Sequence, residues 1–220
     1  MELNLVQTIA IYALPLVLAI TLHEAAHAYV AMHCGDRTAW MLGRVSLNPV
    51  RHIDPTGTIL LPLLLLAVSH GSFAFGWAKP VPVNFQALRN PKRDMFWVAA
   101  AGPAANLVMA LAWAAVLKVC DVSGMLDDQF LVQTAAAGIR INVLFMALNL
   151  LPVLPLDGGR MLTSILPRRA ALRFSKLEPW GLPVLLGVIS LSYFGINVLG
   201  VLLAPIMNAS MAIIGSLFQL

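Results

Sequence analysis

The sequence predicts an all-α protein that crosses a membrane several times. Of its 220 residues, 60% are hydrophobic and only 11% are charged, whereas an ordinary soluble domain is about one quarter charged. Apolar runs of the roughly 20 residues that a bilayer span requires recur along the chain, separated by short polar segments. We therefore expect about four to six transmembrane helices in one domain that covers residues 1–220.

The first apolar run covers residues 5–33 and predicts one long helix. Gly35 and Asp36 form a turn signal directly after it and mark its end. No basic segment precedes the run and no small-residue cleavage site stands out. We therefore expect a retained helix rather than a secretory signal peptide.

A shorter apolar run follows at residues 59–68. It is too short to cross the bilayer, and Pro62 interrupts it. Strand-like patterns flank it at residues 39–47 and 73–83. We therefore expect a short membrane-associated hairpin or strand region, including residues 59–83, between the first and second core helices.

Two further apolar runs, residues 95–119 and 131–156, are each long enough to cross. No charged residue follows Glu178, so the C-terminal region 180–220 is expected to be helical. This region crosses either once with a tail or twice with a break near Pro205.

The distribution of charge predicts the orientation. Basic residues dominate segments 79–94 and 157–178, whereas acidic residues dominate segment 118–128. By the positive-inside rule the first two segments are cytoplasmic and the third lies on the opposite side. The helices over 5–33 and 131–156 then run parallel, both toward the cytoplasm. We interpret the net charge of +4 as topology rather than as a sign of nucleic-acid binding.

The motif HEAAH, near the end of the first helix, carries the chemistry. His23 and His27 are four residues apart and share one helical face, where two imidazoles can hold one zinc ion. Glu24 stands beside them as a general base. Three ionisable groups in a membrane helix need a strong common partner, and a divalent cation is the simplest one. The alternative is a pair of core histidines that hydrogen-bond to neighbouring helices.

A catalytic zinc ion takes three protein ligands and keeps one open position. Asp157 is the candidate third ligand, because it follows the predicted helix that runs parallel to the first. Pro152 and Pro155 make the preceding backbone irregular, which membranes tolerate only in protein interiors or beside wet cavities. The alternative is that Asp157 only caps a turn.

Three motifs together resemble those of the site-2 protease family, the intramembrane zinc metalloproteases of peptidase family M50. They are HEAAH, AGPAAN at residues 101–106 and NLLPVLPLDGG at residues 149–159. The resemblance covers about residues 20–165, and LNPVRHIDPTGT at 47–58 is similar to the compact branch of the family. We therefore expect the compact form, without a PDZ or CBS domain.

The resemblance implies that His23, His27 and Asp157 bind Zn²⁺ and that Glu24 is catalytic. It implies hydrolysis of a peptide bond within or near the transmembrane segment of a substrate membrane protein. The expected partners are this substrate and the lipid bilayer. The expected location is a bacterial inner membrane, with the active site toward the cytoplasm.

Three further polar residues are candidates for the site. By the resemblance, Asn106 and Asn149 hydrogen-bond the substrate or the developing oxyanion, with hydrogen bonding between helices as the alternative. His52 is a candidate behind the ligands or on the substrate side, with a solvated loop histidine as the alternative.

Two other functions use the same residues. A zinc transporter would bind an ion that leaves, but it needs ligands along a pathway, and the histidines do not continue across the membrane. A non-catalytic scaffold for membrane partners would tolerate the loss of Glu24.

Overall fold

The computed structural model describes residues 5–60, 64, 79–191 and 194–219. Every regular element in these residues is helical and none is a strand, which confirms the predicted all-α class. The long helices are α1 (Leu5–His33), α4 (Pro91–Val122), α5 (Gln129–Asn149) and α9 (Val198–Phe218). The shorter helices are α2 (Thr38–Met41), α6 (Asp157–Ile165), α7 (Arg168–Ser175) and α8 (Glu178–Leu191), with helical turns at Pro49–His52 and Pro55–Leu60.

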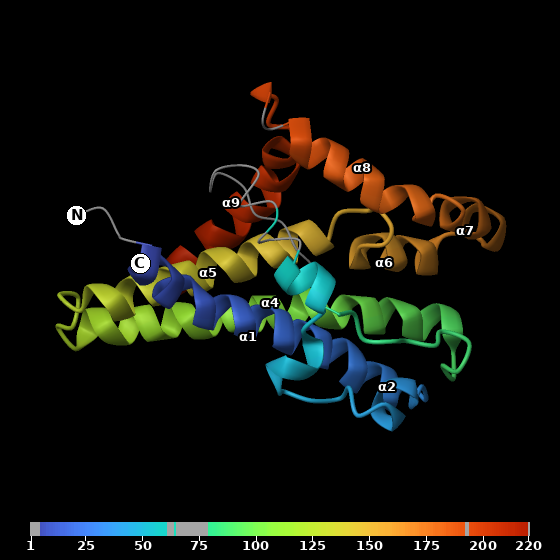
Figure 1. Ribbon diagram of the computed structural model, residues 1–220, viewed down its shortest axis with the longest axis horizontal. Coiled ribbons are helices and arrows are strands. Elements are labelled where there is room, and N and C mark those ends of the chain that lie inside the picture. Colours follow the sequence, from blue (N-terminus) through green and yellow to red (C-terminus); the bar gives the residue numbers. More distant parts are fainter. Residues whose placement is uncertain (1–4, 61–63, 65–78, 192–193, 220) are drawn as a thin grey trace.

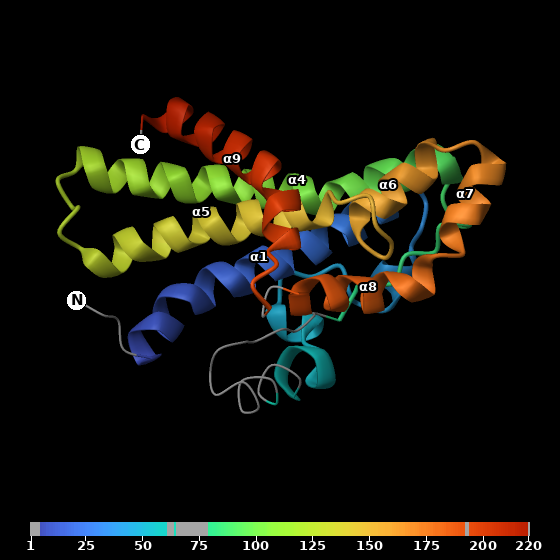
Figure 2. The ribbon, with the colours of Figure 1, turned by 90° about the horizontal axis from the view of Figure 1, so that it is seen from above.

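Within the described residues, four helices are long and apolar enough to cross a membrane: α1, α4, α5 and α9. Helices α1, α4 and α5 lie side by side (Figure 1). Helix α4 runs against the other two, so α1 and α5 are parallel as predicted (Figure 2).

Small residues let the long helices approach closely. Ala110 and Ala114 of α4 are fully buried against Ile139 and Val143 of α5, and Ile214 of α9 joins the same cluster. The alanine-rich sequence of α4 therefore makes it the central helix of the bundle, in contact with α1, α5, α6 and α9.

Two predicted boundaries are wrong. Helix α5 ends at Asn149 rather than at 156, because the prolines that follow lack an N–H and their rings clash with a continuing helix. In the C-terminal region Pro205 lies inside α9, and the break falls before Val198. There Gly195 has a φ of +78°, and the Asn197 side chain accepts a hydrogen bond from Gly200 N at 2.8 Å, which caps the start of α9. Helix α8 has 14 residues and is too short for a span.

The predicted strand at residues 39–47 is also wrong, since α2 covers its first positions up to Met41 and residues 42–47 have no regular secondary structure. Asp36 Oδ1 accepts hydrogen bonds from the N–H and the hydroxyl of Thr38, which turns the chain into a helical conformation. Residues 79–83 have no regular structure. Most of the predicted hairpin at 59–68, and positions 73–78 of the second predicted strand, lie outside the described residues.

Candidate metal centre

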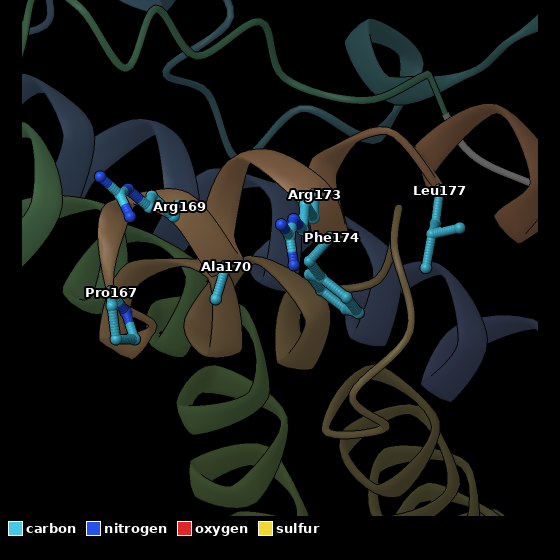
Figure 3. Close-up of a pocket in the computed structure, with 6 residues that line it drawn as sticks. All are labelled: Pro167, Arg169, Ala170, Arg173, Phe174 and Leu177. Carbon is cyan, nitrogen blue, oxygen red and sulfur yellow. The ribbon is translucent and has the colours of Figure 1, made fainter.

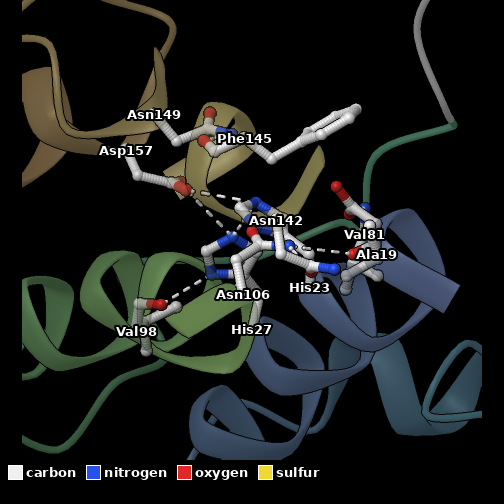
Figure 4. A network of polar contacts seen from close by, with 11 residues as sticks. Ala19, His23, His27, Val81, Val98, Asn106, Asn142, Phe145, Asn149 and Asp157 are labelled. Atoms are coloured by element: carbon white, nitrogen blue, oxygen red, sulfur yellow. Dashed lines mark hydrogen bonds and ion pairs between the residues drawn. The ribbon is translucent and has the colours of Figure 1, made fainter. Parts of the chain in front are cut away.

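Three predicted ligands from two distant parts of the chain meet at one point (Figure 4). His23 and His27 come from the C-terminal part of α1, and Asp157 is the first residue of α6. Asp157 Oδ2 lies 3.2 Å from His23 Nε2 and 3.3 Å from His27 Nε2. The two Nε2 atoms are 3.1 Å apart. No other group of three potential metal ligands occurs in the part of the chain that the structure describes.

These separations fit a tetrahedral zinc ion. Zinc binds imidazole nitrogen and carboxylate oxygen at about 2.0–2.2 Å, which puts neighbouring tetrahedral ligand atoms about 3.3 Å apart. The three observed distances match one face of such a tetrahedron. The fourth position would stay open for water or substrate, as in catalytic zinc sites.

Hydrogen bonds on the outer side of each imidazole select the atom that faces the cluster. His27 Nδ1 donates to the carbonyl of Val98 at 2.7 Å, and His23 Nδ1 donates to Asn106 Oδ1 at 2.6 Å. With each Nδ1 engaged as a donor, Nε2 is the ring atom left to bind a metal. Asp157 adds an anionic carboxylate.

A second asparagine fixes the amide of Asn106. Asn106 Nδ2 donates to Ala19 O at 3.3 Å and to Asn142 Oδ1 at 3.0 Å. Asn142 Nδ2 in turn donates to the carbonyl of Gly138 at 2.8 Å. Because both backbone carbonyls only accept, each amide is held in one orientation, and the Asn106 oxygen points at His23. Both asparagine side chains are fully buried.

Asn142 and the Val98 carbonyl are parts of the site that the sequence analysis missed. Asn142 carried a usable signal, since a polar residue in a membrane helix usually faces the bundle interior and serves a function. The Val98 carbonyl carried none, because every residue has a backbone carbonyl.

Two glycines, Gly102 and Gly158, let backbone segments pack closely around the site. A Cβ added to Gly102 would lie 2.4 Å from His27 Nε2 and 2.6 Å from His23 Nε2, so only glycine lets α4 pass this close. A Cβ on Gly158 would lie 2.3 Å from the carbonyl oxygen of Leu150. The glycine after Asp157 therefore allows the loop after α5 to fold tightly against the start of α6.

The general-base candidate lies at the edge of the cluster. Glu24 is partly buried, and its Oε2 accepts a hydrogen bond from Val81 N at 2.8 Å. The segment around Val81 is held on both sides: Asn84 N donates to Asp36 Oδ2 at 2.7 Å, and Arg44 Nη2 donates to Lys79 O at 2.9 Å. Irregular backbone from residues 79–84 thus borders the site next to Glu24.

The two remaining candidate residues, Asn149 and His52, differ in the groups that they contact. Asn149 lies near Asp157, and its Nδ2 donates to Phe145 O of its own helix at 3.1 Å (Figure 4). His52 is only 2% exposed, and its Nε2 lies 2.9 Å from Ser46 O. The alternative of a solvated loop histidine is therefore wrong. A substrate contact by Asn106 or Asn149, and a role for His52 at the site, stay predictions.

Several bacterial proteins are similar in sequence to this chain. The Bacillus subtilis protein named "Putative zinc metalloprotease YwhC" is 36% identical over 213 residues, which cover 93% of this chain and 89% of that protein. The sequence profile of peptidase family M50 matches residues 116–191, a stretch that contains α5 and Asp157. The chain belongs to peptidase family M50. The resemblance to the site-2 proteases, and with it the assignment to zinc metalloproteases, is confirmed.

Two mycobacterial relatives share shorter stretches with this M50 chain. "Putative zinc metalloprotease Rip2" of Mycolicibacterium smegmatis is 30% identical over 166 residues, 74% of this chain and 60% of Rip2. The protein of the same name from Mycobacterium tuberculosis H37Rv is 29% identical over 142 residues, 64% of this chain and 51% of that protein. No solved structure matches the chain.

The hydrogen bond between Asn142 and Asn106 can be tested by mutation. Replacing Asn142 with leucine removes the acceptor that holds the Asn106 amide, so His23 loses its fixed orientation. Loss of such an outer partner weakens metal binding by about 10–100-fold. We expect a decrease in this range when purified Asn142→Leu competes with a chelator for zinc.

Asn208→Leu is the matched control, because Asn208 is exposed on α9. The zinc affinity of this variant should equal that of the parent protein. Equal zinc affinities in the two variants, with both folded by circular dichroism, would contradict the role of Asn142.

Proposed function

We propose that this M50 chain hydrolyses a peptide bond within or near the transmembrane segment of a membrane protein. In this proposal His23, His27 and Asp157 hold one zinc ion, and Glu24 is the general base. The observation that carries it is the convergence of the three ligand atoms within 3.3 Å of one another, at the end of a membrane-spanning helix.

The depth of the cluster supports cleavage inside the membrane. The apolar run of α4 begins at Met95, after Lys92, Arg93 and Asp94. At 1.5 Å per helical residue, Val98 lies about 5 Å and Asn106 about 16 Å below that boundary along α4. Since these residues hold His27 and His23, the site lies below one face of the bilayer and near enough to it for water to enter.

Each residue has a defined task in this reaction. Zinc at this site would supply a Lewis acid that acidifies water and polarises the scissile carbonyl. Glu24 takes the proton from the attacking water and returns it to the leaving amine. Val98 and Asn106 keep the two imidazoles in place while this happens. In this proposal Asn149 donates a hydrogen bond to the substrate once its Nδ2 releases Phe145 O.

The hydrogen bond between Glu24 and Val81 N bears on activity. While Val81 N donates to one carboxylate oxygen, it orients Glu24 and leaves the other oxygen for the proton transfer. A substrate chain that unwinds at the site would lie beside the irregular backbone of residues 79–84.

Glu24→Gln tests the proposed function. Glutamine keeps the shape of the side chain but cannot take a proton, and general bases contribute about 10²–10⁴-fold to the rate. We expect the purified variant to keep zinc and to lose cleavage of tagged single-span membrane substrates by at least about 100-fold. His23→Ala should lose both zinc and cleavage.

Three outcomes separate the candidate functions. Cleavage by Glu24→Gln at the parent rate would contradict the role of Glu24 as general base, whereas cleavage by the parent that is lost in this variant supports the protease. Zinc uptake into vesicles by the parent protein, without cleavage of any substrate, would favour the transporter. Neither uptake nor cleavage would favour the scaffold.

We also propose that the metal centre faces the cytoplasm of a bacterial cell. The support is the excess of basic residues in segments 79–94 and 157–178, at the end of the bundle nearest the ligands. The relatives named above are bacterial.

Cysteine labelling in intact bacterial cells tests this orientation. In a chain with Cys34 and Cys120 replaced by serine, Leu172→Cys on α7 and Leu126→Cys between α4 and α5 place thiols at opposite ends, and both leucines are exposed. A membrane-impermeant maleimide should label Leu126→Cys and spare Leu172→Cys until the cells are lysed. The reverse pattern would contradict the orientation.

A further inference from the structure

A crevice between the start of α4 and the end of α6 has no part in the proposed reaction. Its volume is about 460 Å³. It is lined by Lys92, Arg93, Phe96 and Trp97 of α4 and by Ser164 and Ile165 of α6.

The crevice divides into a cationic part and an apolar part. Lys92 and Arg93 precede Phe96 and Trp97 by four residues, so the cations and the aromatic rings follow one another along one helical face. The division coincides with the start of the apolar run at Met95, the expected level of the bilayer surface. Trp97 is 58% exposed, and tryptophan is enriched at this level of membranes.

Helix α7, which follows α6 in the chain, adds further exposed cations. It begins three residues after Ile165, and Arg168, Arg169 and Arg173 are all exposed on it. Arg169 and Arg173 also line a shallow groove together with Pro167, Ala170, Phe174 and Leu177 (Figure 3). Arginines and apolar side chains therefore lie next to each other in this groove as well.

Few carboxylates neutralise this surface. Segment 157–178 contains two, Asp157 and Glu178. Asp157 belongs to the metal cluster, and Glu178 pairs with Arg160 at 2.8 Å. In α4, Asp94 pairs with Arg93 at 3.1 Å, but the Arg93 side chain is still 70% exposed. The two segments that contribute to the crevice, 79–94 and 157–178, therefore carry more basic than acidic residues.

A ligand for this crevice needs an anionic group beside a long apolar chain, and it must be present at the bilayer surface. We propose that the crevice binds an anionic phospholipid, with the phosphate at Lys92 and Arg93 and an acyl chain along Trp97 and Ile165. Arginine and lysine bind phosphate through charge-assisted hydrogen bonds. Basic clusters next to transmembrane helices attract anionic headgroups in this way.

The proposed lipid site and the metal centre use neighbouring residues of the same turn of α4. Trp97 lines the crevice, whereas the next residue, Val98, is 2% exposed and its carbonyl accepts the hydrogen bond of His27. The acyl chain packs against the outer side of the same turn of α4 that orients a metal ligand.

Native mass spectrometry of the delipidated full chain tests the proposal, with phosphatidylglycerol and phosphatidylcholine as probes. We expect the parent protein to bind phosphatidylglycerol at least about fivefold more tightly than phosphatidylcholine. Each cation near a membrane surface contributes about fivefold to the binding of anionic lipid, so Lys92→Gln with Arg93→Gln should weaken phosphatidylglycerol binding about 25-fold. Lys118→Gln is the matched control. Lys118 lies near the other end of α4, bonded to Asp121 at 2.8 Å, and this variant should bind as the parent does.

A second variant protects the test against misfolding. Ile165 is 65% exposed, so Ile165→Glu places a carboxylate in the crevice without disturbing a packed core, and it should also lose phosphatidylglycerol. Equal binding of the two lipids by the parent protein, or parent-like binding by both crevice variants, would overturn the proposal. Displacement of phosphatidylglycerol from the parent protein by a soluble polyglutamate peptide would assign the surface to an acidic polypeptide and would overturn it as well. The assay uses neither substrate nor zinc, so its outcome is independent of the proposed proteolysis.

Discussion

The contact of the Asp157 carboxylate with the Nε2 atoms of His23 and His27 is the interaction on which the rest of the structure depends. It joins the C-terminal part of α1 to the first residue of α6, across more than half of the chain. Two imidazoles and a carboxylate in contact near the end of an apolar helix are unfavourable unless a cation binds all three. The arrangement of the bundle brings them together. Helices α1 and α5 run parallel, and the loop after α5 returns the chain to the level of HEAAH (Figure 2).

Helix α4 supplies what the ligands themselves lack. Gly102 lets its backbone touch the imidazoles, and Val98 and Asn106 accept the outer hydrogen bonds of the rings. Gly102 and Asn106 are four residues apart, so the AGPAAN motif presents both on the face toward α1. Asn142 of α5 then locks Asn106, which makes the metal geometry a property of three helices packed together.

Local patterns in the sequence predicted the features that depend on local physics. Helix α1 has the predicted bounds, because one uninterrupted apolar run ends at a glycine turn. The convergence of His23, His27 and Asp157 could be predicted because the spacing of HEAAH puts both histidines on one face and the charge distribution makes α1 and α5 parallel. The sequence did not reveal Asn142, the Val98 carbonyl or the anchoring of Glu24 by Val81, because each depends on contacts between distant segments. The two wrong helix boundaries have local causes, namely the prolines after Asn149 and the Asn197 cap of α9.

Binding of one zinc ion by His23, His27 and Asp157 can be measured by zinc X-ray absorption of the purified full chain, combined with its zinc content. We expect about one zinc ion per chain, with two imidazole nitrogens and with oxygen ligands at about 2.0–2.2 Å. Asp157→Ala should lose one oxygen ligand from the spectrum or lose the metal. A spectrum that is unchanged in Asp157→Ala, or a parent protein that binds no zinc at micromolar concentrations, would contradict the claim.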